Sequence, residues 1–427
     1  MDWFDQFRGL AGIAAILLFA WALSEDRKAR PGWKWIAGAS ALQLALALVI
    51  VRIPLVWKVF AWATEGVAAI ERAARVGSGF IFGYLGGAEL PFALKDGAQA
   101  PVVIAFQILP LVIVFSALSA LLWHWRILDL AVRGLSALLR RTLGVSGAVG
   151  LAGGASVFLG PVESPLIVRA WLPGMSRSDL FAVMTLAMST ISGVILVLYA
   201  QTLSRSVPDA VGHMIAASLI SLPAALLVAR IMVPPSRVPD AAADGGTMME
   251  GRRLQYDSSI DAVLRGTMDG LQIFLAVIAV IIVIFALVAL VDEGLGLLPL
   301  VDGGPISVKR LFGWAFAPVL WLVGVPWAEA QHAGALMGTK TILNEYVAYL
   351  ELAALPPGSL GARSQLIVVY ALCGVANLAS IGLLVSSIGT LCPERRAEAA
   401  KLGIRSWIAG NCATLTTGAW IGLVTLA

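Results

Sequence analysis

The sequence predicts an all-α membrane protein that crosses the bilayer several times. Of its 427 residues, 59% are hydrophobic and 13% are charged, whereas soluble globular chains carry about 25% charged residues. The mean hydropathy is +0.87, and long apolar runs recur along the whole chain. A soluble core could not bury so much apolar surface, so we expect a polytopic helical fold in a bilayer.

Charge and cysteine content exclude several classes of protein. The 30 Lys and Arg residues against 26 Asp and Glu give a formal charge of +4. The basic residues gather in short loops rather than along one face, so no nucleic-acid partner is expected. The three cysteines, Cys373, Cys392 and Cys412, lack the spacing of a zinc site, and no disulfide framework is expected.

Eight apolar runs reach about the 20 residues that a helix needs to cross the hydrocarbon core. They cover residues 9–23, 35–51, 102–123, 180–203, 211–233, 271–291, 365–391 and 404–426. Three other segments, 56–75, 126–141 and 258–269, carry charges at helical spacing on an apolar background. These segments are interpreted as amphipathic helices at the membrane interface. The first apolar run has no small-residue cleavage site, so we expect a retained helix rather than a signal peptide.

Clusters of basic residues predict the orientation in the membrane. They follow the first, fifth and seventh apolar runs, and they comprise Arg27, Lys28, Arg30, Lys34, Arg230, Arg237, Arg252, Arg253, Arg395, Arg396, Lys401 and Arg405. Because cytoplasmic loops carry an excess of Lys and Arg, we expect these loops to be cytoplasmic. Both termini would then lie on the other side, which is the periplasm if the chain is a multi-pass protein of a bacterial inner membrane.

A polar linker at 234–257 divides the chain near its middle. Before it we expect a segment 1–125, with the first helices, an interfacial helix and a scaffold helix, and a first repeat at 126–233. A second repeat, together with the sixth span, is expected at 258–427.

Two apolar stretches are interrupted by glycine and proline, and both are predicted to be re-entrant hairpins. The first covers about residues 145–172 and the second about 307–337. Non-helical backbone at membrane depth is tolerated only where it is buried in protein or lines a wet cavity, so the two tips are expected to face each other. Each hairpin follows an amphipathic segment and precedes a span with a polar centre. An order that occurs twice, as inverted repeats, is typical of secondary transporters.

Each predicted tip carries a glutamate beside proline. Glu163 lies between Pro161 and Pro165, and Glu329 follows Pro326. Proline removes a helical hydrogen bond, and a carboxylate at membrane depth costs roughly 3 kcal/mol, so each glutamate needs a partner or a ligand. Ionised carboxylates accept hydrogen bonds from hydroxyl-rich solutes. The structural alternative is a glutamate that neighbouring backbone N–H groups satisfy.

Smaller polar residues extend the candidate site. Asn377 and Ser380 are three residues apart and share a helix face, where helix–helix hydrogen bonding is the alternative role. Ser156 and Thr190 could give oxygen ligands to a hard cation such as sodium, although such residues also pack as ordinary small side chains. The chain contains no nucleotide-binding loop and no nucleophile elbow. An ion gradient is therefore the expected energy source, and an intramembrane enzyme or a receptor is less favoured than a transporter.

Several motifs together resemble one family. They are found at 77–83, 109–116, 163–165, 179–184, 324–327, 344–349, 373–378 and 393–396. In these motifs the chain is similar to the concentrative nucleoside transporters, the bacterial ion-coupled nucleoside symporters. The resemblance implies a homotrimer in the lipid bilayer whose eight-span protomers have two re-entrant hairpins. It also implies an elevator-like movement of the hairpin domain against a scaffold that includes the third and sixth spans.

The resemblance also implies a substrate site. It places ribose contacts at Glu329, Asn377 and Ser380, and a first-hairpin carboxylate at Glu163. Where the family commonly has Gly-Gln-Thr-Glu or Gly-Gln-Ser-Glu, this chain has Gly160, Pro161, Val162 and Glu163. The aromatic wall residue of the family is Val375 here. We therefore expect a nucleoside importer with altered reading of the base, and another ribose-containing or polyhydroxylated solute is the alternative.

An ion site follows from the same resemblance. It would comprise Ser156, the Leu159 carbonyl, Thr190 and the Ile191 carbonyl. An asparagine of the usual pattern is replaced by Ser156, so both sodium and the proton remain candidates for the coupling ion. No other cofactor is expected.

Overall fold

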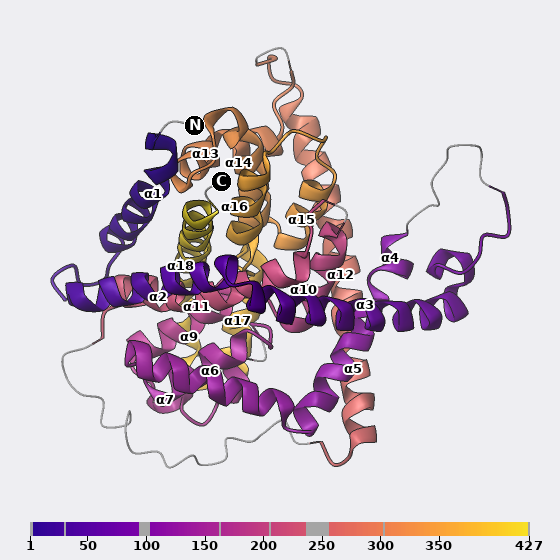
Figure 1. Cartoon of the computed structure of the whole chain (residues 1–427), viewed down its shortest axis with the longest axis horizontal. Helices are drawn as coiled ribbons and strands as arrows, with labels where there is room; N and C mark the ends of the chain where they lie inside the picture. Colours follow the sequence, from indigo (N-terminus) through magenta and orange to yellow (C-terminus); the bar gives the residue numbers. More distant parts are fainter. Residues whose placement is uncertain are drawn as a thin grey trace.

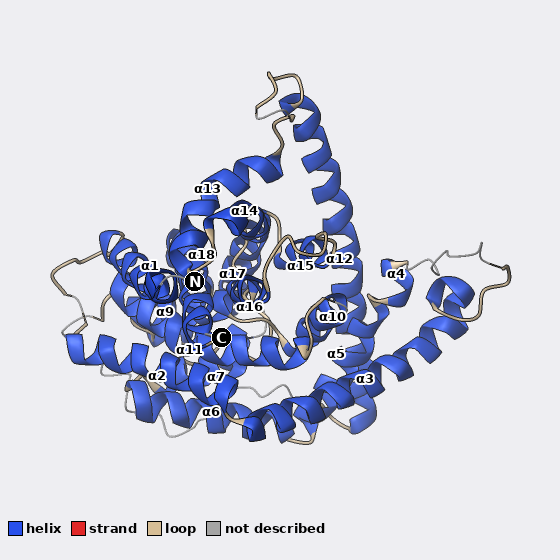
Figure 2. Cartoon of the chain, turned by 45° about the horizontal axis from the view of Figure 1, so that its top comes forward, coloured by secondary structure: helices blue, strands red, loops and turns tan. Residues whose placement is uncertain are grey.

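The computed structural model describes residues 3–29, 31–93, 103–161, 164–204, 206–235, 256–301 and 304–425. These residues form helices joined by short turns (Figures 1 and 2), and they contain no strand beyond one isolated bridge between Val301 and Gly304. The predicted all-α fold is confirmed. The helices are α1 (Trp3–Ala22), α2 (Trp33–Arg52), α3 (Pro54–Phe82), α4 (Ile104–Gln107), α5 (Pro110–His124), α6 (Ile127–Leu143), α7 (Gly147–Ser156), α8 (Ser164–Ile167), α9 (Arg177–Ser189), α10 (Gly193–Leu203), α11 (Ala210–Met232), α12 (Ser259–Leu295), α13 (Val308–Val323), α14 (Trp327–Ile342), α15 (Glu345–Ala353), α16 (Ala362–Leu372), α17 (Leu378–Leu391) and α18 (Arg396–Val424), with short 3-10 turns at Gly83–Gly86, Leu172–Gly174 and Pro393–Arg395.

Membrane-spanning capacity is clear from length and composition. In the described part of the chain, five helical segments are long and apolar enough to cross a bilayer, or up to six if the bent pair of α13 and α14 counts as one span. The shorter apolar helices include α16 and α17, which divide the predicted seventh span. The total of eight spans therefore stays a prediction. The segment 258–269, expected as a separate interfacial helix, is instead the first part of the continuous α12.

Two spans are broken in their middle, and the breaks meet. One break separates α9 from α10, and the other separates α16 from α17. The Val375 N–H donates to the Thr190 carbonyl at 3.3 Å, which joins the two breaks directly. At Gly374 a Cβ atom would lie 3.1 Å from the Met188 carbonyl, so the absence of a side chain eases the close approach of the two backbones.

The first predicted hairpin lies where α7 and α8 are found. Small residues let α7 pack tightly on α6: a Cβ at Gly154 would lie 2.5 Å from the Val132 carbonyl, and one at Gly153 would lie 2.9 Å from Leu139. The helix α8 contacts α17. The residues Val162 and Glu163, predicted to form the tip, lie outside the described residues.

The second predicted hairpin, at about 307–337, falls on α13 and most of α14. Helices α13 and α14 meet at a bend of 117°. Two arginines hold the turn of this bend, because Arg8 donates to the Val325 carbonyl at 2.8 Å and Arg363 donates to the Gly324 carbonyl at 3.0 Å. A further break, at Leu343 and Asn344, separates α14 from α15.

The order of elements shows which break corresponds to the first tip. Helices α6, α7, α8, the broken α9–α10 and α11 match α13, α14, α15, the broken α16–α17 and α18. The cross-contacts agree, because α8 touches α17 in the other repeat and α15 touches α10. In this correspondence α13 takes the place of the amphipathic helix α6. The break between α14 and α15, at Leu343 and Asn344, therefore takes the place in this order that the first predicted tip takes between α7 and α8.

The long helix α12 pairs with α5 at one edge of the molecule (Figures 1 and 2). Gly266 and Gly270 form a small-xxx-small motif that permits this crossing. A Cβ at Gly266 would lie 2.8 Å from the Ser116 carbonyl, and one at Gly270 would lie 2.7 Å from the Ile113 Cα. The other face of α12 is exposed and apolar, with side chains such as Ile282 and Phe285.

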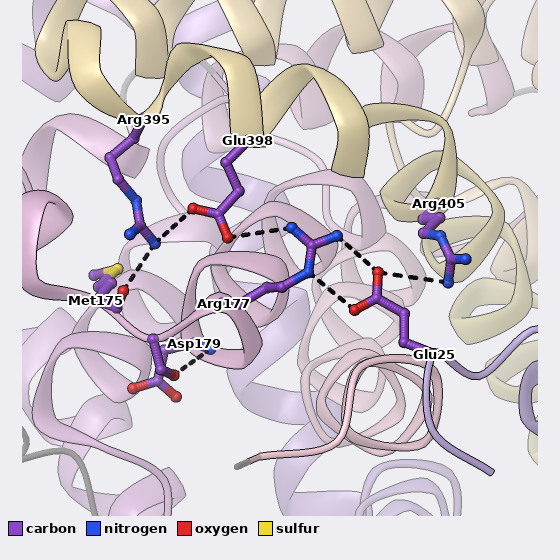
Figure 3. A network of polar contacts seen from close by, with 8 residues as sticks. Glu25, Met175, Arg177, Asp179, Arg395, Glu398 and Arg405 are labelled. Atoms are coloured by element: carbon purple, nitrogen blue, oxygen red, sulfur yellow. Dashed lines mark hydrogen bonds and ion pairs between the residues drawn. The ribbon is translucent and has the colours of Figure 1, made fainter.

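A cluster of charges ties three elements together at one end of the molecule (Figure 3). Arg177, at the start of α9, donates to both carboxylate oxygens of Glu25 in the α1–α2 loop, at 2.7 and 2.9 Å. It also donates to Glu398 of α18 at 3.2 Å. Arg405 lies 3.8 Å from Glu25, and Arg395 lies 3.1 Å from Glu398. We call these five residues the loop–helix clamp.

Candidate functional site

A buried carboxylate lies where the start of α15 meets both broken spans. Glu345 opens α15 and is only 5% exposed. The Tyr199 hydroxyl, from α10, donates to its Oε1 at 2.7 Å, and the Asn377 amide, from the start of α17, donates to its Oε2 at 2.9 Å. Each oxygen of the carboxylate is thus fixed by one donor from a different helix. Such charge-assisted hydrogen bonds are the strong ones, so the orientation of the carboxylate is well defined.

Local sequence explains why Asn344 and Asn377 lie where they do. Both are N-cap residues: the Asn344 side chain accepts from the Val347 N–H at 2.9 Å, and the Asn377 side chain accepts from the Ser380 N–H at 2.9 Å. Asparagine is among the best N-caps because its oxygen satisfies a backbone donor that the helix leaves free. Capping uses the oxygen of Asn377 and leaves its NH2 group to reach Glu345. Ser380 is also buried, one turn into α17.

Glu329 lies elsewhere. It is in the first turn of α14, and its carboxylate accepts from the Gly361 N–H at 3.1 Å. The 16 residues of α14, or about 24 Å of helix, lie between the bend near Glu329 and the break before Glu345. The structure therefore brings Asn377 and Ser380 together with Glu345, and it does not bring Glu329 to them.

Glu329 rather than Glu345 was predicted from the sequence because prolines mark the break beside Glu329. Pro326 precedes the first helical residue of α14, where proline is tolerated and marks only a helix start. The signal that could have found Glu345 is its place directly after an N-capping asparagine within an apolar stretch. Residues 344–349, which include both, also form one of the motifs on which the family resemblance rests.

Three tyrosines surround this carboxylate. The Tyr199 ring stacks on Tyr346 at 5.5 Å between centroids and contacts Tyr349 at 5.1 Å. The Tyr349 hydroxyl donates to the Val369 carbonyl at 3.1 Å. All three side chains are at most 4% exposed. These aromatic rings exclude water from one side of Glu345 and strengthen its electrostatic interactions.

The structure brings two of the predicted ion ligands into direct contact. The Thr190 hydroxyl donates to the Ser156 carbonyl at 2.8 Å, and the Ser156 hydroxyl donates to the Gly153 carbonyl at 2.9 Å. Ile191 follows Thr190 in the same break and is fully buried, and Leu159 follows the end of α7. Hydroxyl lone pairs and carbonyl oxygens are the ligands that hard cations prefer, so this set fits sodium.

The base side of the predicted site is less polar. Pro161 and Gly160 are partly exposed, and Val375 is 7% exposed with its N–H bonded to Thr190. The Ser164 hydroxyl, beside the first-hairpin tip, is buried and has no hydrogen-bond partner in the described part of the chain. It is the polar group nearest in sequence to Glu163.

No cluster of three or more His, Cys, Asp and Glu side chains that could hold a metal ion occurs among the described residues. The polar centre is instead built from amides, hydroxyls and single charged groups at two helix breaks. Broken helices that meet around buried polar groups in an apolar helical fold define a secondary membrane transporter.

Comparison with known proteins gives the family. Residues 213–422 match the family described as Na+ dependent nucleoside transporter C-terminus, and residues 11–85 match its N-terminus. Residues 105–206 match a domain described as nucleoside recognition. The chain belongs to the concentrative nucleoside transporter family, and it is a multi-pass membrane transporter.

Relatives and solved structures agree over nearly the full length. An uncharacterized transporter of Bacillus subtilis, YutK, is 33% identical, covering 97% of this chain and 98% of the relative. The nucleoside permease NupC of Helicobacter pylori is 29% identical, with 98% of both chains covered. CNTnw in an inward-facing substrate-bound state matches with a TM-score of 0.87 at 33% identity, covering 98% of this chain and 99% of that one. A doubly substituted CNTnw in an outward-facing state gives a TM-score of 0.89 at 32% identity, covering 99% of this chain and 98% of that one.

Proposed function

We propose that this chain imports nucleosides by cation symport and that the Glu345 carboxylate receives the hydroxyl groups of the sugar. The observation that carries the proposal is the buried Glu345 held by Tyr199 and Asn377. Each ionised oxygen can accept more than one hydrogen bond, and each uses one for the protein. Both oxygens therefore keep accepting capacity for ribose O–H donors. The nucleoside permeases among the relatives support this class of substrate.

Glu345 replaces Glu329 in the proposed ribose site, while Asn377 and Ser380 keep their predicted roles. Asn377 retains a second amide N–H that can donate to a sugar oxygen. Glu163 stays a predicted contact of the first hairpin. Because Pro161 and Val375 offer no polar side chain, we propose that the base adds fewer hydrogen bonds and that base selectivity is relaxed.

Sodium is the proposed coupling ion. The family description and the oxygen-rich contacts of Ser156 and Thr190 support it. The hydroxyl of Ser156 would act as an oxygen ligand in place of the amide that is usual in the family. Uptake that is unchanged when choline replaces sodium but follows a pH gradient would assign the coupling to protons instead.

The mode of transport is proposed from the same architecture. The exposed apolar face of α12, paired with α5, suits the scaffold of a homotrimer. The two hairpins and broken spans would then move past this scaffold like an elevator between the outward-facing and inward-facing states that CNTnw adopts. We place the protein in a bacterial inner membrane with both termini periplasmic, as the basic loops predict.

Uptake of labelled uridine and adenosine into proteoliposomes tests the proposal. In Glu345→Gln, a neutral amide replaces the carboxylate, so uptake is expected to fall at least about 100-fold, as for a lost charged hydrogen-bond partner of roughly 3 kcal/mol. The matched variant Glu329→Gln removes a carboxylate at the other break and is expected to retain uptake within about threefold.

If Glu329→Gln lost uptake and Glu345→Gln kept full activity, Glu329 rather than Glu345 would be the ribose-binding carboxylate. If the wild-type protein, inserted and folded, transported neither nucleoside in sodium or in a pH gradient, the substrate class would be wrong.

A further inference from the structure

Lys340 is a fully buried lysine within the membrane-embedded part of the fold, and the ribose and ion sites do not use it. It lies near the end of α14 at 0% exposure. Its ammonium group donates to Asn411 Oδ1 at 2.7 Å and to Thr414 Oγ1 at 3.3 Å, both on α18. A buried ionisable group at membrane depth is expensive and has a functional role by default.

The inverted repeat gives this position a counterpart. In the first repeat, the predicted ion ligands Thr190 and Ile191 are the two residues before the N-cap of α10, and they face the last turn of α7. In the second repeat, Ala376 directly precedes Asn377, the N-cap of α17. The Ala376 carbonyl is therefore the equivalent of the Ile191 carbonyl.

That equivalent carbonyl is connected to Lys340. The Asn411 amide donates to the Ala376 carbonyl at 3.0 Å, while its Oδ1 accepts from the Lys340 ammonium. The Thr341 hydroxyl also approaches Asn411 Oδ1, at 3.3 Å. Lys340 itself belongs to the last turn of the hairpin arm α14, as the ion site belongs to the last turn of α7. The first-repeat ion site thus lies directly between the end of α7 and the break of a span, and the Lys340 ammonium, at the end of α14, reaches the corresponding break through Asn411 of α18.

We propose that the Lys340 ammonium is a tethered cation that fills the second repeat's equivalent of the ion site. This inference rests on the proposed function, since it takes the ion site of the first repeat as its reference. Lys340 and Glu345 lie close enough for their charges to attract each other, so the fixed cation also offsets the buried carboxylate when no ion is present there. The second repeat then requires no free ion.

The oxygen atoms around the ammonium make the proposal testable. Asn411 and Thr414 present two side-chain oxygens to the ammonium, the ligand type that sodium prefers, and the Thr341 hydroxyl lies 3.3 Å from Asn411 Oδ1. Removing the lysine side chain while keeping these oxygens should open a site that a sodium ion can occupy. An ammonium that serves only as a mechanical link between α14 and α18 would leave no such site.

The experiment compares thermal unfolding midpoints in detergent, without nucleoside, in sodium chloride and in choline chloride of equal ionic strength. Lys340→Ala leaves the space and the oxygens, whereas the matched Lys340→Met fills the space with an apolar side chain. The unfolding midpoint of Lys340→Ala is expected to rise by on the order of 1–2 °C more than that of the wild type for each tenfold increase in sodium concentration above the dissociation constant of the new site. The unfolding midpoint of Lys340→Met is expected to show no additional rise with sodium. Equal sodium responses of the two variants would overturn the proposal.

A second variant covers the case in which Lys340→Ala does not fold. Lys340→Ala combined with Asn411→Asp adds a carboxylate to the same oxygens, so it should be recovered folded in sodium and not in choline. Failure in both salts would also overturn the proposal. These stability measurements use no nucleoside, so a negative result would overturn the proposal for Lys340 without affecting the proposed nucleoside uptake. Conversely, the effect of Glu345→Gln on uptake is measured independently of the sodium response of Lys340→Ala.

Discussion

Tyr199 and Tyr349 lie in one buried aromatic cluster, yet their hydroxyl groups serve different acceptors. Tyr199 donates to the Glu345 carboxylate at 2.7 Å, and Tyr349 donates to the Val369 carbonyl at 3.1 Å. The first bond orients the group proposed to receive the sugar, and the second belongs to the helix packing. This pair separates a positioning role from a purely structural one.

Tyr199→Phe is expected to raise the KM for nucleoside uptake about tenfold, because a lost hydrogen bond to a charged group costs about 1.5 kcal/mol. The loss should be much smaller for a 3′-deoxynucleoside, which makes fewer hydroxyl contacts with Glu345. Uptake of both substrates by Tyr199→Phe and by the control Tyr349→Phe gives the measurement. An equal loss for both substrates would mean that Tyr199 acts on the fold and not on the sugar.

Prolines in the sequence led to the choice of candidate glutamates, whereas asparagines mark the starts of the helices that form the polar site. The sequence analysis chose Glu163 and Glu329 because prolines flank them, but Pro326 only starts α14. Asn377 and Ser380 are both buried, but Asn377 is the N-cap of α17 with extended backbone, so it meets Ser380 by capping its N–H and not by sharing a helix face. The contact of Asn377 with Glu345 joins residues 32 apart in the chain, and no local pattern predicts it.

At the scale of elements, the crossing of α5 and α12 depends on close backbone approach. Without a hydrophobic driving force between helices in lipid, small residues at the contact and dispersion contacts provide the stability. Gly266 meets α5 with no space for a side chain, since an added Cβ would lie 2.7 Å from the Ala120 Cβ. By contrast, Gly134 in the middle of α6 has nothing within 4 Å of an added Cβ.

Gly266→Ala is therefore expected to lower the free energy of unfolding by about 1–2 kcal/mol, because overpacking outweighs the gain in helix propensity. Gly134→Ala is expected to raise it by up to about 1 kcal/mol, because only the gain in propensity applies. Denaturation in detergent, followed by circular dichroism, measures both changes. Stabilisation by both substitutions would show that the α5–α12 crossing can relax at no cost.

The boundary expected between the segment 258–269 and the apolar run that follows it is absent from the structure. The segment 258–269 carries an i,i+4 ion pair between Asp261 and Arg265, which suggested a separate interfacial helix. The helical period continues without a stop signal into the apolar run, so the segment forms part of α12.

For the whole molecule, the loop–helix clamp joins the α1–α2 loop to the starts of α9 and α18 (Figure 3). The hydrogen bonds from Arg177 hold the pKa of Glu25 below its usual value, although partial burial opposes this shift. A carboxyl group with a lowered pKa in the folded state adds stability above its unfolded pKa, near 4.3, and loses that contribution as the pH falls through its folded pKa.

Glu25→Gln is therefore expected to lower the stability by about 1 kcal/mol at pH 7, a value in the upper range for exposed ion pairs because several arginines surround Glu25. The difference from the wild type should shrink as the pH falls below about 4.3 toward the lowered pKa of the folded state. Thermal unfolding in detergent between pH 7 and pH 3.5 tests this expectation. The control is Glu71→Gln, which removes one exposed i,i+4 pair with Arg75 and should change little. A difference for Glu25→Gln that persists unchanged at the lowest pH would contradict the assignment.

The sequence by itself determined that the chain is an all-α membrane transporter, because bilayer length, hydropathy and helix-breaking residues act locally along the chain. The sequence also showed that small polar residues, such as Thr190 and Asn377, interrupt two of the apolar spans. Only the tertiary structure decided that the breaks of the two spans meet, that Glu345 accepts from Asn377, and that Lys340 reaches α18. Those contacts depend on how two inverted halves cross in space, and hydrogen bonds between distant segments leave no periodic trace in the sequence.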